Sequence, residues 1–212
     1  MARTHTPWGD WEPAAPADVH ELFAGFPAPW WLAGGFAVEL ALGHSLREHG
    51  DIDVLVLRRD HLAVQDVLRG WELWAADPPG ALRPWRAGEV LPAGVCDVWC
   101  RPAADQPWRI QIMVDESEGE CWTSRRNPRV RRSVWSIGRI GEGGIPYLAP
   151  EILLFYKAKN TRAKDETDFA ALLPLLGAEQ RRWLAEAIRD TCGAHQWLSR
   201  IGPGLGSPGC CC

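Results

Sequence analysis

The stretches WLAGGFAVELALG (residues 31–43) and REHGDIDV (residues 47–54) decide how this chain folds. Residues 30–32 predict a short strand, and the apolar run at residues 36–42 predicts a helix that ends at a glycine. Residues 51–57 are rich in β-formers and continuously apolar after their first positions, which is typical of a central strand buried on both faces. The two stretches therefore predict a strand, a helix and a second strand, with paired glycines before the helix and paired aspartates opening the second strand.

The paired aspartates and glycines together indicate phosphate chemistry. Asp51 and Asp53 are two residues apart on the predicted strand, so their side chains point to the same face. Two carboxylates this close repel one another unless a cation lies between them, and hard oxygen ligands select Mg²⁺ or Mn²⁺. Gly34 and Gly35 have no Cβ to block a triphosphate, and the N-terminus of the following helix favours phosphate oxygens. Metal-binding carboxylates beside a phosphate-binding turn are what phosphoryl transfer requires.

Each of these features is weak evidence when it occurs alone. Gly-Gly and Asp-x-Asp pairs arise often in turns and at strand ends, and an Asp-Ile-Asp opening is also compatible with a solvated strand edge. Here Gly-Gly, a helix, Arg-x-His and Asp-Ile-Asp-Val follow one another in a single short segment. This combination is far more specific than its parts and favours the functional interpretation.

Residues 30–57 resemble the signature of the DNA-polymerase-beta-type nucleotidyltransferase superfamily. They are most similar to its aminoglycoside and lincosamide nucleotidyltransferase branch, whose pattern is Trp-Leu-x-Gly-Gly-Trp-x-x-Asp, a glycine, and then Arg-x-His-x-Asp-Ile-Asp. Two positions depart conservatively from that pattern, since Phe36 replaces the usual Trp and Glu39 the usual Asp. Weaker similarity extends toward the C-terminus and includes LAPE (residues 148–151) and the Lys and Asp residues of KAKNTRAKDETD (residues 157–168).

The resemblance implies a mixed β-sheet with flanking helices, a Mg²⁺ ion, a nucleoside triphosphate that we expect to be ATP, and release of pyrophosphate. By position, it implies that Asp51 and Asp53 are catalytic metal ligands. It also implies that Gly34 and Gly35 form the phosphate loop.

The resemblance further implies a third carboxylate on a later strand, where it serves as a metal ligand or as the general base. Asp97 is the first candidate, because its surroundings match the family's strand pattern of an apolar residue, Asp and another apolar residue. Asp115 or Glu116, at the end of the next predicted strand, is the alternative. A general base must lie within hydrogen-bond reach of the acceptor hydroxyl, and this is a matter of geometry. Asp97 is equally compatible with a surface-facing hairpin position.

Several cationic residues near these motifs are candidates for nucleotide binding. Arg47 and His49 flank the aspartates, and they either contact the triphosphate or belong to a charged loop. Lys164 is a further nucleotide-binding candidate. It shares with Lys157 and Lys159 the alternative of facing solvent in pairs with nearby acidic residues.

Two other features have both a functional and a plain structural interpretation. A basic run would suit a phosphate or an acidic acceptor, but such runs more often form a solvated face. Its members are Arg125, Arg126, Arg129, Arg131 and Arg132. Glu39, in an otherwise apolar helix, either orients the active-site loop or lies on the exposed side of that helix.

The rest of the chain predicts an α/β (α+β) fold that ends in helices. Further helices are expected at about 16–24, 61–69, 150–159, 165–176, 178–191 and 195–201. Further strands are expected at about 71–75, 82–86, 95–101, 108–114 and 145–148, with a hairpin joining the third and fourth of these. We expect a flexible lead-in at residues 1–15, a nucleotidyltransferase core at 16–145, a helical region at 146–201 and a disordered tail at 202–212.

Composition narrows the classes of partner. The formal net charge of −4 offers no broad basic excess for general binding to nucleic acid or anionic membranes. No apolar run of about 18 residues or more predicts a transmembrane helix, and the first residues lack a signal-peptide pattern. We therefore expect a cytoplasmic protein whose seven cysteines are reduced. The 13 tryptophans are expected either to pack in the core or to line a pocket for a flat or sugar-like ligand.

The working hypothesis is a Mg²⁺-dependent nucleotidyltransferase that acts on a hydroxyl of a small molecule, with an aminoglycoside-like antibiotic among the candidate acceptors. One alternative is a catalytically silent nucleotidyltransferase fold that acts as a binding protein or toxin–antitoxin component. A second alternative is a purely structural α/β domain. The silent alternative would lack the third carboxylate, so the position of Asp97 bears directly on it.

Overall fold

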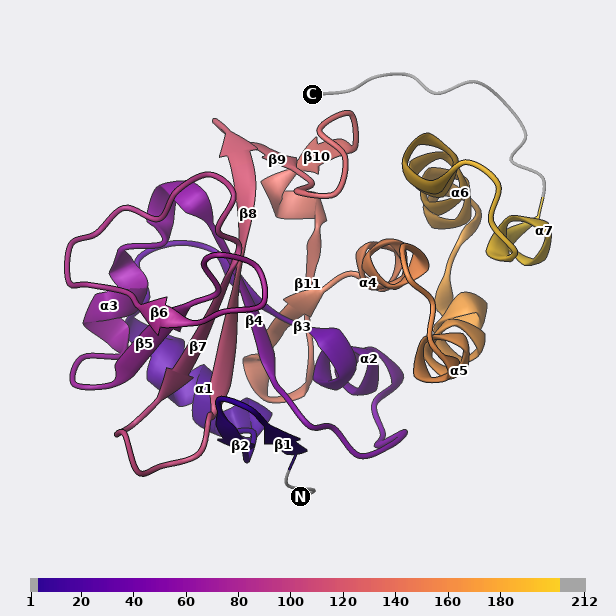
Figure 1. The fold of residues 1–212 in the computed structure, drawn as a ribbon. Coiled ribbons are helices and arrows are strands. Elements are labelled where there is room, and N and C mark those ends of the chain that lie inside the picture. Colours follow the sequence, from indigo (N-terminus) through magenta and orange to yellow (C-terminus); the bar gives the residue numbers. More distant parts are fainter. Residues whose placement is uncertain (1–3, 203–212) are drawn as a thin grey trace.

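The computed structural model describes residues 4–202 (Figure 1). A mixed sheet lies at its centre, with strand order β11-β12-β3-β4-β8-β7-β5-β6, and β9 and β10 extend from β8. Its strands are β3 Trp30–Ala33, β4 Asp53–Leu57, β5 Glu72–Ala75, β6 Arg83–Pro84, β7 Asp97–Arg101, β8 Ile110–Glu118, β9 Cys121–Thr123, β10 Arg131–Ser133, β11 Gly138–Ile140 and β12 Pro146–Leu148. Strands β1 Thr4–Thr6 and β2 Gly9–Trp11 form a separate hairpin.

Helices surround this sheet and follow it in the chain. They are α1 Pro16–Leu22, α2 Gly34–Leu42, α3 Ala63–Val67, α4 Pro150–Ala158, α5 Ala163–Leu172, α6 Ala178–Cys192 and α7 Trp197–Ile201. Short 3₁₀ helices are η1 Phe23–Gly25, η2 Arg58–Asp60, η3 Val134–Ser136, η4 Glu142–Gly144 and η5 Leu173–Leu175. In the described part of the chain, none of the helices combines the length and the apolar character that a bilayer crossing needs.

The predicted central strand is confirmed. β4 pairs antiparallel with β3 and parallel with β8, and β8 pairs antiparallel with β7, so the sheet is mixed and residues 95–114 form the expected hairpin. Residues 54–57 of β4 are fully buried. The strand begins at Asp53, so Asp51 lies just before it rather than within it.

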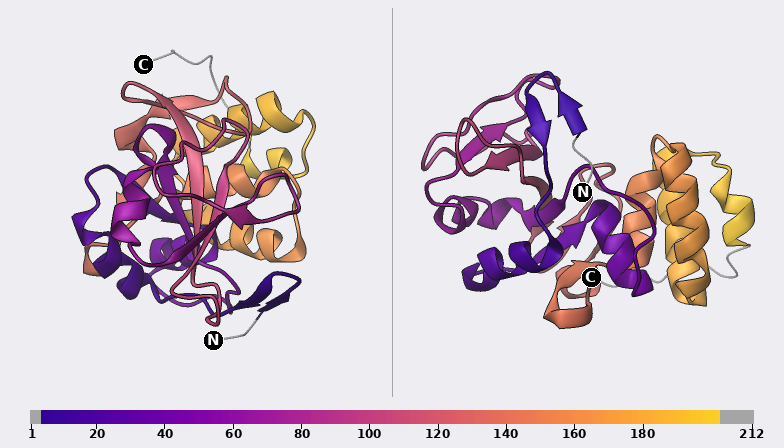
Figure 2. Two further views of the ribbon diagram at one scale, coloured as in Figure 1. Left: turned by 60° about the vertical axis from the view of Figure 1, so that its left-hand side comes forward. Right: turned by 90° about the horizontal axis from the view of Figure 1, so that it is seen from below.

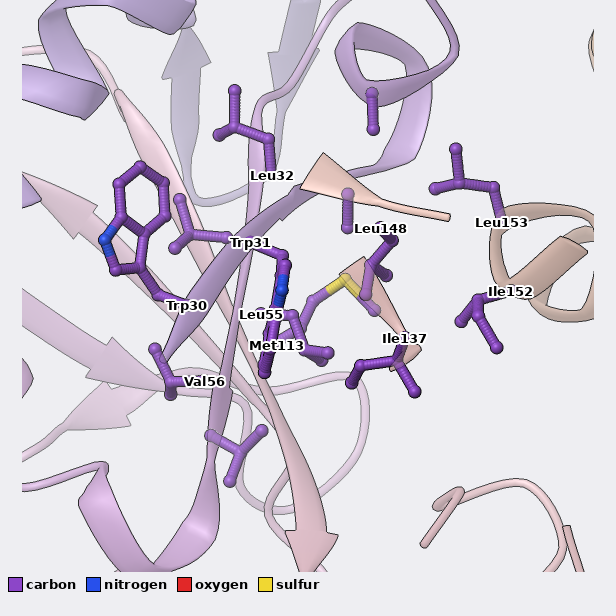
Figure 3. Close-up of a cluster of buried hydrophobic side chains, with 14 of the residues drawn as sticks. Trp30, Trp31, Leu32, Leu55, Val56, Met113, Ile137, Leu148, Ile152 and Leu153 are labelled. Carbon is purple, nitrogen blue, oxygen red and sulfur yellow. The ribbon is translucent and has the colours of Figure 1, made fainter. Parts of the chain in front are cut away.

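The two faces of the sheet differ. We call the face that carries Asp53 and its pairing partner Gln111 the carboxylate face. On the opposite face, Trp30 of β3 packs against Phe23, which follows α1, with ring centroids 5.1 Å apart. On the carboxylate face near β3 and β12, the Trp31 indole lies in a buried apolar cluster that α4 closes with residues such as Leu153 (Figure 3). The core therefore covers both faces of the sheet at β3.

The C-terminal helices form a layer beside the sheet (Figures 1 and 2). α4 packs against α5 and α6, and α2 contacts both α4 and α5. Glu151 at the start of α4 is fully buried, where Arg132 Nη1 donates to its Oε1 at 2.8 Å and Gln180 Nε2 to its Oε2 at 2.9 Å. This carboxylate joins β10, α4 and α6. β12 belongs to the sheet, and α4 begins two residues after it. A domain boundary near residue 145 stays a prediction.

Two sequence expectations need correction, and three short strands were not expected. Residues 4–11, expected to be a loose lead-in, form the β1–β2 hairpin, and Trp11 is buried at 3% exposure. The basic segment and its surroundings contain β9, β10 and β11. Strands of three residues are too short to show alternation, which explains why sequence periodicity missed them. The expected helix at 61–69 is reduced to α3, after η2. Residues 203–212 of the expected tail lie outside the described part of the chain.

The buried Glu151 site predicts a large effect on stability. We expect Glu151→Ala to lower the free energy of unfolding by about 3 kcal/mol, because Arg132 is left without its buried partner. Glu118→Ala is the matched control, since Glu118 bonds Arg131 with its side chain 80% exposed, and we expect a change below about 1 kcal/mol. Urea unfolding measures both. Equal effects of the two substitutions would contradict this account of Glu151.

Candidate active site

The glycine turn and the aspartates meet at one point. Ala33 of β3 pairs with Asp53 of β4, which brings Gly34 against the Asp53 side chain. Gly34 has φ +63°, and a Cβ at this position would lie 2.1 Å from Asp53 Oδ2. At Gly35, a Cβ would lie 2.0 Å from His49 Nδ1. Both glycines are therefore required by their neighbours, and at Gly34 the backbone conformation adds a second requirement.

Asp51 and Asp53 line the same cavity of about 350 Å³, with Gly34 and Gln111 beside them. Burial, together with the charges of Asp51 and Asp97, raises the pKa of Asp53 to about 7, although Lys157 and Arg125 oppose the rise. A divalent cation bound between Asp51 and Asp53 would relieve the repulsion between their carboxylates. The pair is therefore chemically suited to Mg²⁺.

Asp97 lies on the carboxylate face as well. It pairs with Met113, which is two residues from Gln111 on β8, and side chains two apart on a strand share a face. Gln111 Nε2 and Arg125 Nη1 each donate to Asp97 Oδ1 at 3.1 Å. The Asp97 side chain is 34% exposed, so it remains accessible to a substrate.

Among residues 4–202, no three His, Cys, Asp or Glu side chains come close enough together to bind a metal ion by themselves. Asp51 and Asp53, which both line the cavity, are the first candidates for metal ligands. This suits Mg²⁺, which is commonly bound by one or two carboxylates together with water and substrate phosphates. Metal binding by Asp97 stays a prediction.

The alternative third carboxylates are engaged elsewhere. Asp115 is fully buried and accepts hydrogen bonds from Trp122 Nε1 at 2.7 Å and from the Tyr156 hydroxyl. Burial raises its pKa, against the opposing hydrogen bond from Tyr156 and charge of Arg125. Glu116 pairs with Arg58. Neither carboxylate lines the cavity, and Asp97 does not line it either, but Asp97 differs in being partly exposed and bound to Gln111 and Arg125, which do.

The side of the cavity opposite the strands is cationic. Arg125, Arg126, Lys157 and Arg162 all line it, against one further acidic residue, Asp165. Four cations around paired aspartates match a metal-bound triphosphate in charge. The sequence interpretation of the basic run as a solvated face is wrong for Arg125, whose side chain is only 15% exposed.

Lys157, rather than Lys164, reaches the cavity. Lys157 Nζ lies 2.8 Å from Asp168 Oδ2 and 3.5 Å from Asp165 Oδ1. Lys164 is exposed at the start of α5 and does not line the cavity. Nucleotide binding by Lys164 therefore stays a prediction, and Lys157 on α4 is the lysine that the structure brings to the cavity.

Arg47 and His49 hold the loop before the aspartates in place. Arg47 Nε and Nη2 donate to the two oxygens of Asp168 at 3.1 and 3.0 Å. His49 Nε2 lies 2.9 Å from Glu39 Oε1, which also accepts the Leu46 and Arg47 backbone N–H groups. Burial lowers the pKa of His49, although contact with Glu39 opposes this. Neither Arg47 nor His49 lines the cavity, so nucleotide binding by them stays a prediction.

Sequence reasoning missed Gln111, Tyr156 and Arg162 as cavity residues. A polar residue between Ile110 and Ile112 was the only local signal for Gln111. Its position beside Asp53 depends on the register between β4 and β8, which local periodicity does not specify.

The contact between Gly34 and Asp53 predicts a specific loss of nucleotide binding. Gly34→Ala and Gly43→Ala both place a side chain at positive φ, but the added Cβ meets nothing within 4 Å at Gly43. We expect each variant to lose about 1–2 kcal/mol of stability from backbone strain. Only Gly34→Ala should also weaken Mg²⁺·ATP binding, by about tenfold or more, since Asp53 must move. Calorimetric titration measures this, and equal affinities in both variants would refute it.

The elevated pKa of Asp53 predicts how pH affects the metal-free protein. The folded state binds this proton more tightly than the unfolded state, so the carboxyl group lowers stability as pH rises from about 4 to about 7. In EDTA at about pH 8, we expect Asp53→Asn to have a higher melting temperature than wild type. The rise should be about 2–4 °C for each kcal/mol by which the substitution increases the free energy of unfolding. The difference should vanish toward about pH 4. Mg²⁺ should stabilise only wild type. A lower melting temperature for the variant at high pH would contradict the assignment.

Comparison with solved structures gives the same fold at low identity. The crystal structure of ANT(2")-Ia in complex with adenylyl-2"-tobramycin has a TM-score of 0.53 and 16% identity, covering 81% of this chain and 95% of that chain. The lincomycin-bound crystal structure of the lincosamide antibiotic adenylyltransferase LnuA has a TM-score of 0.51 and 18% identity, covering 76% and 95%. No curated protein sequence matches the chain.

The family assignment comes from a sequence model that spans most of the chain. The model described as aminoglycoside-2''-adenylyltransferase matches residues 17–172. This range contains the glycine turn, the paired aspartates, Asp97 and the α4–α5 cations. The expected resemblance and fold are confirmed, and the chain belongs to the aminoglycoside-2''-adenylyltransferase family and is a nucleotidyltransferase.

Proposed function

We propose that this nucleotidyltransferase moves AMP from Mg²⁺·ATP to a hydroxyl of a small amino-substituted acceptor such as an aminoglycoside. The observation that carries the proposal is the contact of Gly34 with Asp53 inside a cavity whose other wall is cationic. The acceptor class is taken from ANT(2")-Ia, whose crystal structure contains an adenylylated tobramycin. A cytoplasmic location, where ATP is available, stays a prediction.

Asp51 and Asp53 would hold the metal ion. When bound, Mg²⁺ neutralises phosphate charge and helps to orient the reacting oxygens. Arg125 and Lys157 bind the triphosphate and stabilise the charge that develops on pyrophosphate as it leaves. Gly34 gives phosphate oxygens access to the N-terminus of α2. We assign Arg47 and His49 a positioning role, because they anchor the loop that leads to Asp51.

Asp97 is the proposed general base. The acceptor hydroxyl oxygen forms a bond to the α-phosphorus as the bond from that phosphorus to pyrophosphate breaks, and the hydroxyl proton passes to Asp97. Gln111 and Arg125 both bind Asp97 Oδ1, which fixes the carboxylate on the face that carries Asp53. Orientation of this kind is what a general base needs. A silent nucleotidyltransferase fold would need no such third carboxylate, so we favour the enzyme.

An acceptor panel tests this proposal. Labelled ATP and Mg²⁺ are incubated with tobramycin, lincomycin or no acceptor, and pyrophosphate release and labelled product are measured. We expect Asp97→Asn to lower kcat by about 10²-fold or more, because the amide cannot accept the hydroxyl proton. Mg²⁺·ATP affinity should change little, because the amide oxygen can still accept hydrogen bonds from Gln111 and Arg125. Asp53→Asn should lose both activity and Mg²⁺·ATP affinity.

Glu116→Gln is the control for this test, because Glu116 bonds Arg58 outside the cavity, and its activity should stay near that of wild type. If the wild-type protein modifies neither tobramycin nor lincomycin, the proposed acceptor class is refuted. Full activity in Asp97→Asn would refute the role of Asp97.

A further inference from the structure

The carboxylate face continues past Asp53 into an aromatic surface. Strand register places four residues in one row, since Asp53 pairs with Gln111, Gln111 with Trp99, and Trp99 with Trp74. Laterally paired residues point to the same face of a sheet. Two indoles therefore lie in line with the catalytic pair, on the side away from α4 and α5. We call Trp74 and Trp99 the tryptophan surface.

The tryptophan surface is partly open. Burial alternates along β5 and β7, so Leu73, Ala75, Val98 and Cys100 are buried on the opposite face. Trp74 and Trp99 are only half-buried on the carboxylate face. Large aromatic side chains left accessible beside catalytic carboxylates are typical of a ligand-binding surface.

Other tryptophans hold these two indoles rigidly. The Trp99 ring packs edge-on to Trp11 and Trp108, with centroids 5.0 and 5.6 Å apart, and Trp74 lies 6.5 Å from Trp108. The Arg101 guanidinium covers Trp108 at 4.4 Å and bonds Glu72. The buried Trp11 and Trp108 therefore support the half-buried Trp74 and Trp99.

The N-terminal hairpin lies beside this surface. Trp108 Nε1 donates to the Trp8 carbonyl oxygen at 2.8 Å, and Trp11 contacts Trp99. At its other end the hairpin comes near Gly50, where a Cβ would lie 2.4 Å from Thr4 Oγ1, next to Asp51. Figure 2 shows the hairpin standing on the side of the sheet away from α1. The hairpin thus connects the tryptophan surface to the loop that carries the aspartates.

We propose that Trp74 and Trp99 form the acceptor-binding surface, on which a saturated, amine-bearing ring stacks with its hydroxyl toward Asp97. The inference rests on the proposed function and adds the location of the acceptor. Lys157 and Arg162, which suit ATP, lie on the α4–α5 side of Asp53, and the indoles lie on the other side, beyond Asp97 and its partner Arg125. Indole faces attract both C–H groups and protonated amines, while an arginine-lined wall repels such amines. An aminosugar or aminocyclitol therefore fits the indole side, and ATP fits the cationic side.

Kinetics with tobramycin test this surface. We expect Trp99→Leu and Trp74→Leu each to raise KM for tobramycin and its calorimetric Kd, measured without ATP, by about tenfold. KM for ATP should stay within about twofold of wild type, because the cationic side is untouched. Trp99→Phe keeps an aromatic face and should recover most of the affinity. Trp135→Leu, at a tryptophan that is 68% exposed and lines a different groove, should match wild type.

The outcomes separate this inference from the proposed function. If wild type transfers to tobramycin and both leucine variants keep its KM and Kd, then acceptor binding by the tryptophan surface is refuted while the proposed function stands. A rise in KM for ATP instead of tobramycin also overturns it, because the indoles would then stack on adenine. Absence of transfer by wild type to both tobramycin and lincomycin overturns the proposed function and this surface together. Melting curves and Trp99→Phe exclude loss of folding as the cause of an effect.

Discussion

The close approach of Gly34 to Asp53 is the constraint around which this molecule is built. Antiparallel pairing of β3 with β4 sets Ala33 opposite Asp53, so the next residue must turn into α2 directly against a carboxylate oxygen. Any side chain at position 34 would displace the Asp53 carboxylate. As a result, the N-terminus of α2, which suits phosphate oxygens, and the paired carboxylates, which suit a divalent cation, occupy one edge of the sheet. The remaining site residues reach this point from other parts of the chain.

The charges around Asp53 are balanced by nearby cations, which are in turn paired with other carboxylates. Asp53 lies among other carboxylates, which together with burial raises its pKa to about 7, and Lys157 and Arg125 partly compensate. Those cations form ion pairs of their own. Lys157 pairs with Asp168, and Arg125 pairs with Asp97 and the buried Asp115. Each cation therefore has a partner before substrate arrives, so it is fixed in position and loses little conformational entropy when a triphosphate binds.

The open half of the carboxylate face has a different character. Toward β3 and β12, α4 covers the face with apolar side chains, whereas toward β5 and β7 it presents polar residues and two half-buried tryptophans. The N-terminal hairpin contributes Trp11 to the support of Trp99, so a segment without recognisable periodicity becomes part of the site. This difference in character between the two halves of the face is the basis for the proposal that nucleotide and acceptor bind on opposite sides of Asp53.

The amino-acid sequence by itself determined the strand–helix–strand unit, the mixed α/β class and the importance of the glycine and aspartate pairs, because these depend on residues close together in the chain. Tertiary structure alone decided which distant residues join them. Register between β4, β8 and β7 placed Gln111, Asp97 and Asp115 on the face of Asp53, and packing of Trp122 and Tyr156 then buried Asp115. The packing of α4 selected Lys157 over Lys164. A one-residue change of register would turn each of these strand side chains to the other face, and local periodicity carries no information about register between strands far apart in the chain.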